Sequence, residues 1–244
     1  MINFTADQRF IVTGASSGIG EGVALLLNSL GATVIAVARR ADRLEELKLK
    51  AEYPENLHIE SKDLTEDIPA LPAFIKELKE KYGKLQGMAC CAGLGGLQPL
   101  RALDAGDLQK IFNINYFVPV FLAKGFADKR NRMPEKCSIV CIASMGDVRA
   151  EAGMTAYSGS KGALIASMQS IARELASAGV RVNCVSPSLI DTDMAGETER
   201  AHAEGKYPFG LGSVSDVANM IAYLLSEEAK WITAQNYHID CGAF

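Results

Sequence analysis

Short apolar runs alternate with longer stretches of mixed polarity along the whole chain. Each short run is typical of a buried strand, and the stretches between the runs repeat apolar residues at helical spacing. Strands are expected at residues 9–13, 33–38, 57–60, 86–91, 137–143, 180–186 and 237–240. The alternation predicts an α/β fold, a doubly wound parallel sheet of about seven strands flanked by helices on both faces.

The stretches between the runs also carry signals for helix ends. Helices are expected after residue 20, with a stop at Gly31, and at residues 41–52, 68–82, 107–129, 152–178 and 214–225. Pro119 should bend the long helix, and Ser213 should cap the last one. Residues 187–212 show little regular pattern, which favours a substrate lid at about 189–212. Because no linker or repeat interrupts the chain, residues 1–244 are predicted to form a single domain.

Composition and charge narrow the class of protein. The 244 residues are 48% hydrophobic and 22% charged, which is ordinary for a globular protein. The formal net charge of −4 supplies no basic field for nucleic acid. Most of the six cysteines lie in apolar runs, which favours reduced thiols and a cytoplasmic location. The N-terminus does not resemble a signal peptide, no apolar stretch suggests a membrane span, and we expect no metal site.

A glycine-rich stretch directly follows the first expected strand and opens a helix. Strand, glycine-rich turn and helix form the context of a phosphate-binding loop, because glycines let the backbone approach a pyrophosphate and the helix N-terminus supplies free N–H groups. The alternative is a tight strand–helix turn without a ligand. The residues that the loop would offer to a dinucleotide are Gly14, Ser16, Ser17, Gly18, Ile19 and Gly20.

Arg39 and Arg40 follow the second expected strand, where a dinucleotide places its adenosine ribose. A carboxylate there would bind the 2′-hydroxyl of NAD, whereas arginine suits the 2′-phosphate of NADP. We therefore expect NADP, with NAD possible. The alternative is a solvated pair at a helix start. Asp63, after the third strand, either caps the next helix or faces the adenine.

The strongest chemical signal is the pair Tyr157 and Lys161. At i and i+4 the two side chains share one face of a helix. A cation beside a phenol favours the phenolate and draws its pKa towards neutrality. Ser144 ends an apolar run, so its hydroxyl can hydrogen-bond a substrate oxygen. These residues suggest proton transfer to or from an oxygen atom.

The glycine-rich loop and the other candidate segments each follow an expected strand. The carboxyl ends of parallel strands meet at one edge of a sheet, where ligands bind. We therefore expect the glycine-rich loop, Arg39, Asp63, Gly93, Ser144 and Pro187 to converge there.

With these motifs in view, the chain resembles the short-chain dehydrogenase/reductase family, in its single-domain type of roughly 250 residues, over nearly its full length. The resemblance rests on TGASSGIG at Thr13–Gly20, Asp63–Leu64, Ala92–Gly93, Asn115, the set Ser144, Tyr157 and Lys161, NCVSP at Asn183–Pro187, and IDTDM at Ile190–Met194. It implies a Rossmann fold and an oxidoreductase that passes hydride between a nicotinamide and a carbonyl carbon.

The resemblance also implies a role for each matched residue. Tyr157 would be the general acid/base, Lys161 would lower its pKa and bind the nicotinamide ribose, and Ser144 would hold the substrate oxygen. Asn115 would anchor a proton-relay water. Beyond the glycine-rich loop and the arginines, the cofactor would contact Asp63, Leu64, Cys91, Ala92, Gly93, Tyr157, Lys161, Pro187, Ser188, Ile190 and Thr192.

Three positions depart from the family pattern. Cys90 and Cys91 replace the two asparagines of NNAG, Ser188 replaces the glycine of a Pro-Gly pair, and the late DGG-like end reads Asp240-Cys241-Gly242. All three concern cofactor geometry, since none removes a catalytic group.

The substrate would be a carbonyl or alcohol small molecule. Within the family the chain looks most like 3-oxoacyl-[acyl-carrier-protein] reductases, so a 3-oxoacyl thioester, a sugar or a small ketone are the candidates. The expected lid offers Met194, Arg200, His202, Lys206, Tyr207 and Phe209. The resemblance also implies a homodimer or homotetramer. The alternative function is a non-catalytic dinucleotide-binding sensor or scaffold, which would be expected to have lost Tyr157 or Lys161.

Overall fold

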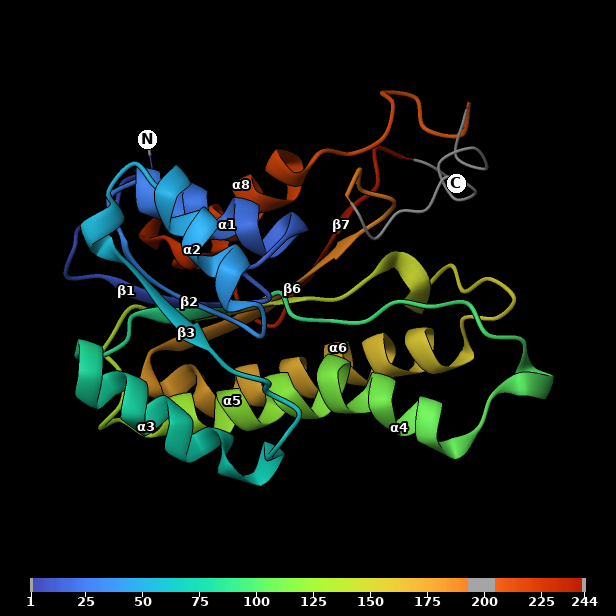
Figure 1. Cartoon of the computed structure of the whole chain (residues 1–244), viewed down its shortest axis with the longest axis horizontal. Helices are drawn as coiled ribbons and strands as arrows, with labels where there is room; N and C mark the ends of the chain where they lie inside the picture. The colour runs from blue at the N-terminus through green and yellow to red at the C-terminus, as the bar shows by residue number, and fades with distance from the viewer. Residues whose placement is uncertain (1, 193–204, 243–244) are drawn as a thin grey trace.

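The computed structural model describes residues 2–192 and 205–242 and contains one seven-stranded sheet (Figure 1). The strands are β1 Arg9–Thr13, β2 Thr33–Ala38, β3 Leu57–Ser61, β4 Gly87–Cys90, β5 Cys137–Ile142, β6 Val180–Pro187 and β7 Asn236–Ile239. They are parallel and lie in the order β3-β2-β1-β4-β5-β6-β7. The doubly wound parallel sheet predicted from the sequence is therefore confirmed.

Helices cover both faces of this sheet. On one face lie α1 Gly18–Ser29, α2 Ala41–Lys50 and α8 Val214–Leu225. On the other lie α3 Leu71–Tyr82, α4 Ala105–Phe112, α5 Val118–Ala127 and α6 Thr155–Leu175. Within the described residues, no helix is long and apolar enough to cross a membrane.

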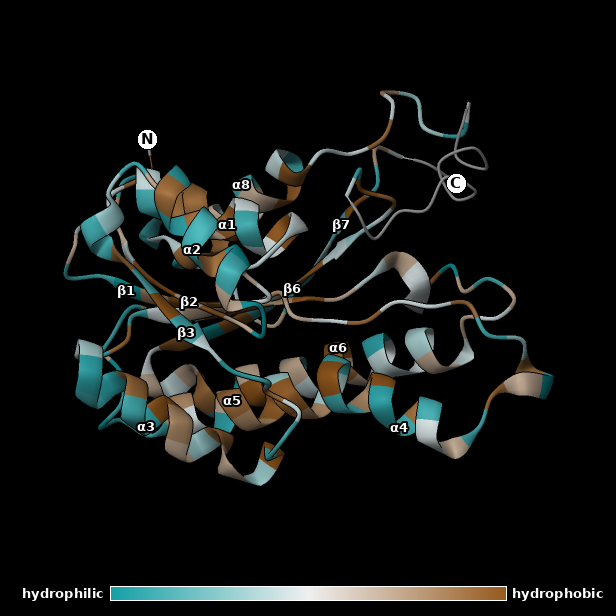
Figure 2. Ribbon diagram, viewed as in Figure 1, coloured by the Kyte–Doolittle hydropathy of each residue, from teal (hydrophilic) through white to brown (hydrophobic). Residues whose placement is uncertain are grey.

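Two apolar cores separate the helix layers from the sheet, and the strands β1, β2, β4, β5 and β6 contribute side chains to both. Phe10 and Val12 of β1 belong to the core under α1 and α8, whereas Ile11 belongs to the core under α3, α5 and α6. Figure 2 shows the result: hydrophobic colour marks the strands, and the helices are mixed, with hydrophilic colour on outward surfaces. Burial on both faces explains why the strands read as continuous apolar runs.

The long helix expected at 107–129 is the main difference. Asp104 accepts the N–H of Asp107 at 2.9 Å and caps the helix, so α4 begins at Ala105. A π-helical turn, Asn113–Phe117, then separates α4 from α5. Pro119 is the second residue of α5 and directly follows the π-helical turn, so the regular helix is interrupted next to the proline at which a bend was expected.

The last predicted cap is present, and part of the expected lid can be placed. Ser213 and Asp216 form a reciprocal capping box at the start of α8. Ile190 and Gly212 form a parallel bridge, which brings the two ends of the 189–212 stretch together. The expected lid residues Met194, Arg200 and His202 lie outside the described residues.

Candidate active site

The predicted residues gather where the strands end, at the right of Figure 1. A Cβ on Gly14 would lie 2.8 Å from the backbone of Ala92. One on Gly93 would lie 3.1 Å from Asn115 Oδ1 and 3.5 Å from Lys161 Nζ. The loops after β1 and β4 therefore touch, and the second reaches the expected catalytic residues.

The glycine-rich loop needs its glycines. Gly14 and Gly18 have φ values of 69° and 56°, a region that glycine enters without strain. A Cβ on Gly20 would collide with the carbonyl oxygen of Gly14. The loop is therefore a tight turn held against the start of α1.

The N-terminus of α1 is open to a ligand. Ser17 is the N-cap residue, yet its side chain makes no capping hydrogen bond. The first turn of α1 therefore keeps N–H groups for an outside acceptor, together with the positive end of the helix dipole. These donors and the close-packed glycines fit a pyrophosphate.

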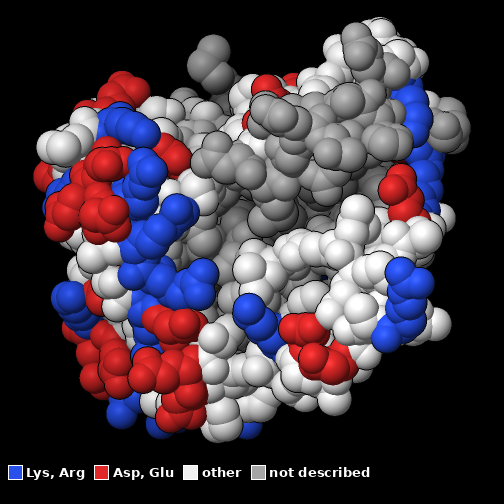
Figure 3. Space-filling model, turned by 45° about the vertical axis from the view of Figure 1, so that its right-hand side comes forward, with Lys and Arg blue, Asp and Glu red and all other residues white. Residues whose placement is uncertain are grey.

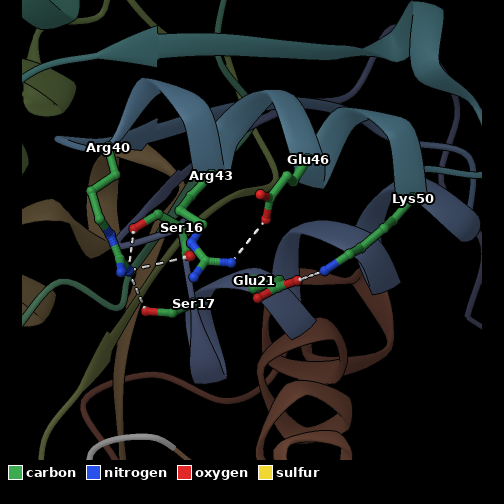
Figure 4. Close-up of polar contacts among 7 residues, drawn as sticks. All are labelled: Ser16, Ser17, Glu21, Arg40, Arg43, Glu46 and Lys50. Atoms are coloured by element: carbon green, nitrogen blue, oxygen red, sulfur yellow. Dashed lines mark hydrogen bonds and ion pairs between the residues drawn. The ribbon is translucent and has the colours of Figure 1, made fainter.

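The Ser16 and Ser17 hydroxyls of this loop do not cap the helix and accept hydrogen bonds from an arginine. Arg40 Nη2 donates to Ser16 Oγ at 3.0 Å and to Ser17 Oγ at 2.9 Å, as Figure 4 shows. Two further cations in that view pair with carboxylates, Arg43 with Glu46 and Lys50 with Glu21. Arg40 thus reaches the glycine-rich loop through two side-chain hydrogen bonds.

Arg39 takes a different direction. Its guanidinium lies 3.9 Å from the Asp63 carboxylate and is 68% exposed. Asp63 accepts hydrogen bonds from Thr65 N at 2.8 Å and Oγ1 at 2.7 Å, and these lower the pKa of its carboxyl group. Asp63 therefore orders the turn after β3, while Asp67 caps the 3-10 turn that leads into α3. Leu64 beside it is buried.

Lys161 is the most deeply placed cation of the site. It lies on α6, is 4% exposed, and donates to the carbonyl oxygen of Ile142 at 2.7 Å. Burial lowers the pKa of Lys161 to about 8, because the ammonium is disfavoured away from water. Its Nζ is 5.8 Å from the centre of the Tyr157 ring, so the expected pairing on one helix face is present.

Tyr157 differs from the expectation in the direction of its pKa. Burial raises the pKa of this phenol, and a hydrogen bond with Ser144 opposes that rise without reversing it. The sequence led us to expect a lowered pKa from Lys161, but that ammonium is directed at the Ile142 carbonyl. In this structure burial therefore favours the protonated form of Tyr157, and its hydroxyl meets Ser144.

Asn115 connects the β4 loop with the catalytic helix. Its Nδ2 donates to Leu94 O at 2.9 Å and to Ser160 Oγ at 3.0 Å, and its Oδ1 accepts from Leu94 N at 2.9 Å. Ser160 in turn donates to Tyr157 O at 2.7 Å. Both donor hydrogens of the amide are used within the protein, so the Asn115 side chain could hold a water only through the second lone pair of Oδ1. Ser160 was not predicted from the sequence, although its i+3 spacing from Tyr157 places the two residues on the same face of a helix.

Comparison with known proteins agrees with this architecture. The family model described as enoyl-(acyl carrier protein) reductase matches residues 14–243. The 3-oxoacyl-[acyl-carrier-protein] reductases FabG of Salmonella typhimurium and Rickettsia felis are 30% and 31% identical, over 96% and 99% of this chain and 96% and 98% of their own. The chain belongs to the short-chain dehydrogenase/reductase family. It is therefore an oxidoreductase, as the sequence predicted.

Solved structures of this family superpose closely. A glucose/ribitol dehydrogenase from Brucella melitensis has a TM-score of 0.92 at 25% identity and covers 100% of this chain and 99% of its own. A short-chain dehydrogenase from Burkholderia cenocepacia, in complex with NADP, has a TM-score of 0.90 at 29% identity and covers 99% of both chains.

Cys90 and Cys91 replace the two asparagines of the NNAG motif, and Cys90 is part of a row of buried thiols. Cys90, Cys141 and Cys184 are paired in register on β4, β5 and β6 and are buried. Cys91 packs on the opposite face of the sheet, where burial raises the pKa of its thiol. The backbone N–H groups of Cys91 and Ala92 donate to Thr13 Oγ1 at 3.1 and 3.2 Å, so a side chain from β1 secures the end of β4.

The remaining expected cofactor residues lie at the end of β6. Pro187 and Ile190 are buried, and Ser188 is half-buried. The side chain of Thr192 would be 3.5 Å from a Cβ on Gly18, so this segment reaches the start of α1. Within the part of the chain that the structure describes, no cluster of three or more His, Cys, Asp or Glu side chains could hold a metal ion.

Proposed function

We propose that this protein is an NADP(H)-dependent reductase that reversibly converts a carbonyl group into an alcohol, with Tyr157 as the general acid/base. One observation carries the proposal: the half-buried Tyr157 lies between Ser144 and the buried ammonium of Lys161, whose Nζ is 5.8 Å from the centre of the phenol ring. The relatives named 3-oxoacyl-[acyl-carrier-protein] reductase support the reaction class.

The residues present fit NADP. The first turn of α1 would bind the pyrophosphate, and the strand end after β2 offers arginines and no carboxylate to the adenosine ribose. Because Arg40 already reaches Ser16 and Ser17, we assign the main 2′-phosphate contact to Arg40, with Arg39 as a second cation. The similar protein solved in complex with NADP supports this choice. When bound, the reduced nicotinamide supplies the hydride.

Three residues of the chain would then orient the carbonyl group and transfer the proton. Ser144 would hold the carbonyl oxygen by a hydrogen bond, and Tyr157 would donate its proton to that oxygen. A raised pKa keeps Tyr157 protonated before the reaction, and Lys161 would stabilise the phenolate left behind. In the alcohol-to-ketone direction the phenolate would accept the proton.

The edge around the site favours a substrate with an apolar tail. Leu97, Leu100 and Val148 are 57%, 74% and 58% exposed. Gln98 N donates to Gly153 O at 2.8 Å, which joins the segment bearing the leucines to the segment after Ser144. Below the grey residues, Figure 3 shows uncharged surface with basic and acidic side chains beside it. We therefore place a 3-oxoacyl thioester ahead of a sugar; a homodimer or homotetramer stays a prediction.

Loss of NADPH absorbance with an acetoacetyl thioester tests the proposal. Tyr157→Phe should reduce kcat/KM by about a hundredfold or more, because general acid catalysis contributes on that scale. Tyr53→Phe is the matched control, since Tyr53 hydrogen-bonds with Asn28 through its backbone. Equal rates for wild type and Tyr157→Phe would refute the role of Tyr157, and a sugar preferred over the thioester would refute the substrate class.

A further inference from the structure

Two segments that are distant in the sequence run together beside the end of β6. Asp191 N donates to Gly212 O at 2.8 Å, next to the bridge between Ile190 and Gly212. The chain just before Gly212 is thereby held against the residues that follow β6. Tyr207 lies in this returning segment.

Tyr207 is the residue of its segment that turns inward. Residues 205, 206 and 208–210 are exposed, with Phe209 at 86%, whereas Tyr207 is half-buried. Its hydroxyl lies 2.7 Å from Ser188 Oγ and accepts a longer hydrogen bond of 3.4 Å from Leu189 N. A large amphipathic side chain is thus used to meet one serine.

Ser188 is itself held firmly. Its N–H donates to Ile239 O at 2.9 Å, which ties it to β7. The Ser188 and Tyr207 hydroxyls carry two protons, and the hydrogen bond between them uses one. The other proton remains available to an acceptor outside the pair. A glycine at position 188, as in the family pattern, would offer no such donor.

The order of the strands indicates which part of a bound dinucleotide would lie near the hydroxyl pair of Ser188 and Tyr207. The glycine-rich loop follows β1 and the arginines follow β2, so the adenosine half lies towards β2 and β3. Ser144 follows β5, so the reacting half lies towards β5. Ser188 follows β6, the neighbour of β5 on the side away from β1.

We propose that Ser188 and Tyr207 form a hydroxyl pair that binds the nicotinamide half of the cofactor, with Tyr207 as the positioning residue. This inference rests on the proposed function. The carboxamide of the nicotinamide offers a carbonyl oxygen that suits the free proton. Tyr207 holds the Ser188 side chain in place and limits the rotamers that binding would otherwise have to restrict.

Ligand binding without turnover tests the pair. The dissociation constants of NADP⁺ and of 2′-phospho-ADP-ribose, which lacks the nicotinamide, are measured for wild type, Ser188→Ala, Tyr207→Phe and the double variant. Each single change should weaken NADP⁺ about fivefold to tenfold, the usual effect of one hydrogen bond, and leave the fragment unchanged. The double variant should resemble the single ones, because the two groups act as a unit. Tyr53→Phe should change neither ligand.

The outcomes separate the possibilities. Equal weakening of both ligands would show a general disturbance of the fold and overturn the proposal, as would unchanged binding of NADP⁺ or additive effects in the double variant. A wild-type protein that binds neither ligand would instead overturn the proposed function. Ser188→Gly, which restores the family residue, should weaken NADP⁺ as Ser188→Ala does; tighter binding would show that the serine obstructs the nicotinamide.

Discussion

Arg40 reaches the glycine-rich loop across an exposed surface, whereas Lys161 makes its hydrogen bond from a side chain that is only 4% exposed. The proposed adenosine half of the site is made of backbone donors and solvated cations, whose charge water screens. In the proposed proton-transfer half Lys161 is buried and Tyr157 is half-buried, and burial is the largest cause of the pKa shift of each. Substitutions in the first half should therefore change affinity, and those in the second should change chemistry or folding.

Lys161→Met should have the largest effect. It removes the cation that stabilises the Tyr157 phenolate, so kcat for carbonyl reduction should fall by about a hundredfold to a thousandfold. In wild type the rate should decline as pH rises through about 8, because Lys161 then loses its proton. A pH profile of NADPH oxidation measures both effects. An unchanged pH profile in Lys161→Met would show that another group titrates.

The same variant has a folding readout that separates chemistry from damage. The folded pKa of Lys161 is about 8 and its ordinary value is 10.5, so between these values the unfolded chain binds more protons. Wild-type stability should therefore rise with pH across this window by about 3 kcal/mol, at 1.36 kcal/mol per unit. Urea unfolding should show this rise in wild type and not in Lys161→Met.

Asn115→Ala should act mainly on folding. It removes the hydrogen bonds that the Asn115 side chain makes with the N–H and C=O of Leu94 and with the Ser160 hydroxyl. We expect the free energy of unfolding to fall by about 2–3 kcal/mol, measured by urea denaturation. Asn113→Ala is the control in the same π-helical turn, because its side chain accepts an exposed hydrogen bond from Gln109. Equal losses for both variants would contradict a special role of Asn115.

The bounds of an element could be predicted from the sequence where neighbouring residues determine them, and not where distant residues do. The bounds of β1 and β2 match the prediction because an apolar run between turn residues is a local signal. The start of α4 was also local: Asp104 precedes Asp107 by three residues, a capping pattern that we overlooked. The π-helical turn had no local signal, since Asn115 finds its partners 21 and 45 residues away.

The site shows the same limit. The spacing of Tyr157 and Lys161 predicted that they share a helix face, and they do. The pKa direction of Tyr157 could not be predicted, because burial is a property of the packed molecule. Adjacent positions also hid the difference between Arg39 and Arg40: both follow β2, but one turns to Asp63 and the other to Ser16 and Ser17.

That difference supplies the smallest expected effect. Arg40→Gln should weaken NADPH about tenfold through loss of charge-assisted hydrogen bonds to the 2′-phosphate, and should leave NADH unchanged. Arg39→Gln should weaken NADPH less, because Asp63 competes for its guanidinium. Arg43→Gln is the control, since Arg43 pairs with Glu46 at 2.9 Å on its own helix. Fluorescence titration with both reduced cofactors measures all three.

The opposite ranking of Arg40→Gln and Arg39→Gln in NADPH binding would be equally informative. If Arg39→Gln weakened NADPH more than Arg40→Gln, the hydrogen bonds of Arg40 to Ser16 and Ser17 would belong to the ligand-free chain alone. Binding would then exchange one exposed arginine for the other at little cost, because neither is buried. No such exchange is open to Lys161, because its ammonium is buried and donates to the Ile142 carbonyl oxygen beside the proposed active site. The exposed half would adapt to its ligand, whereas the buried half would have to be preorganised for it.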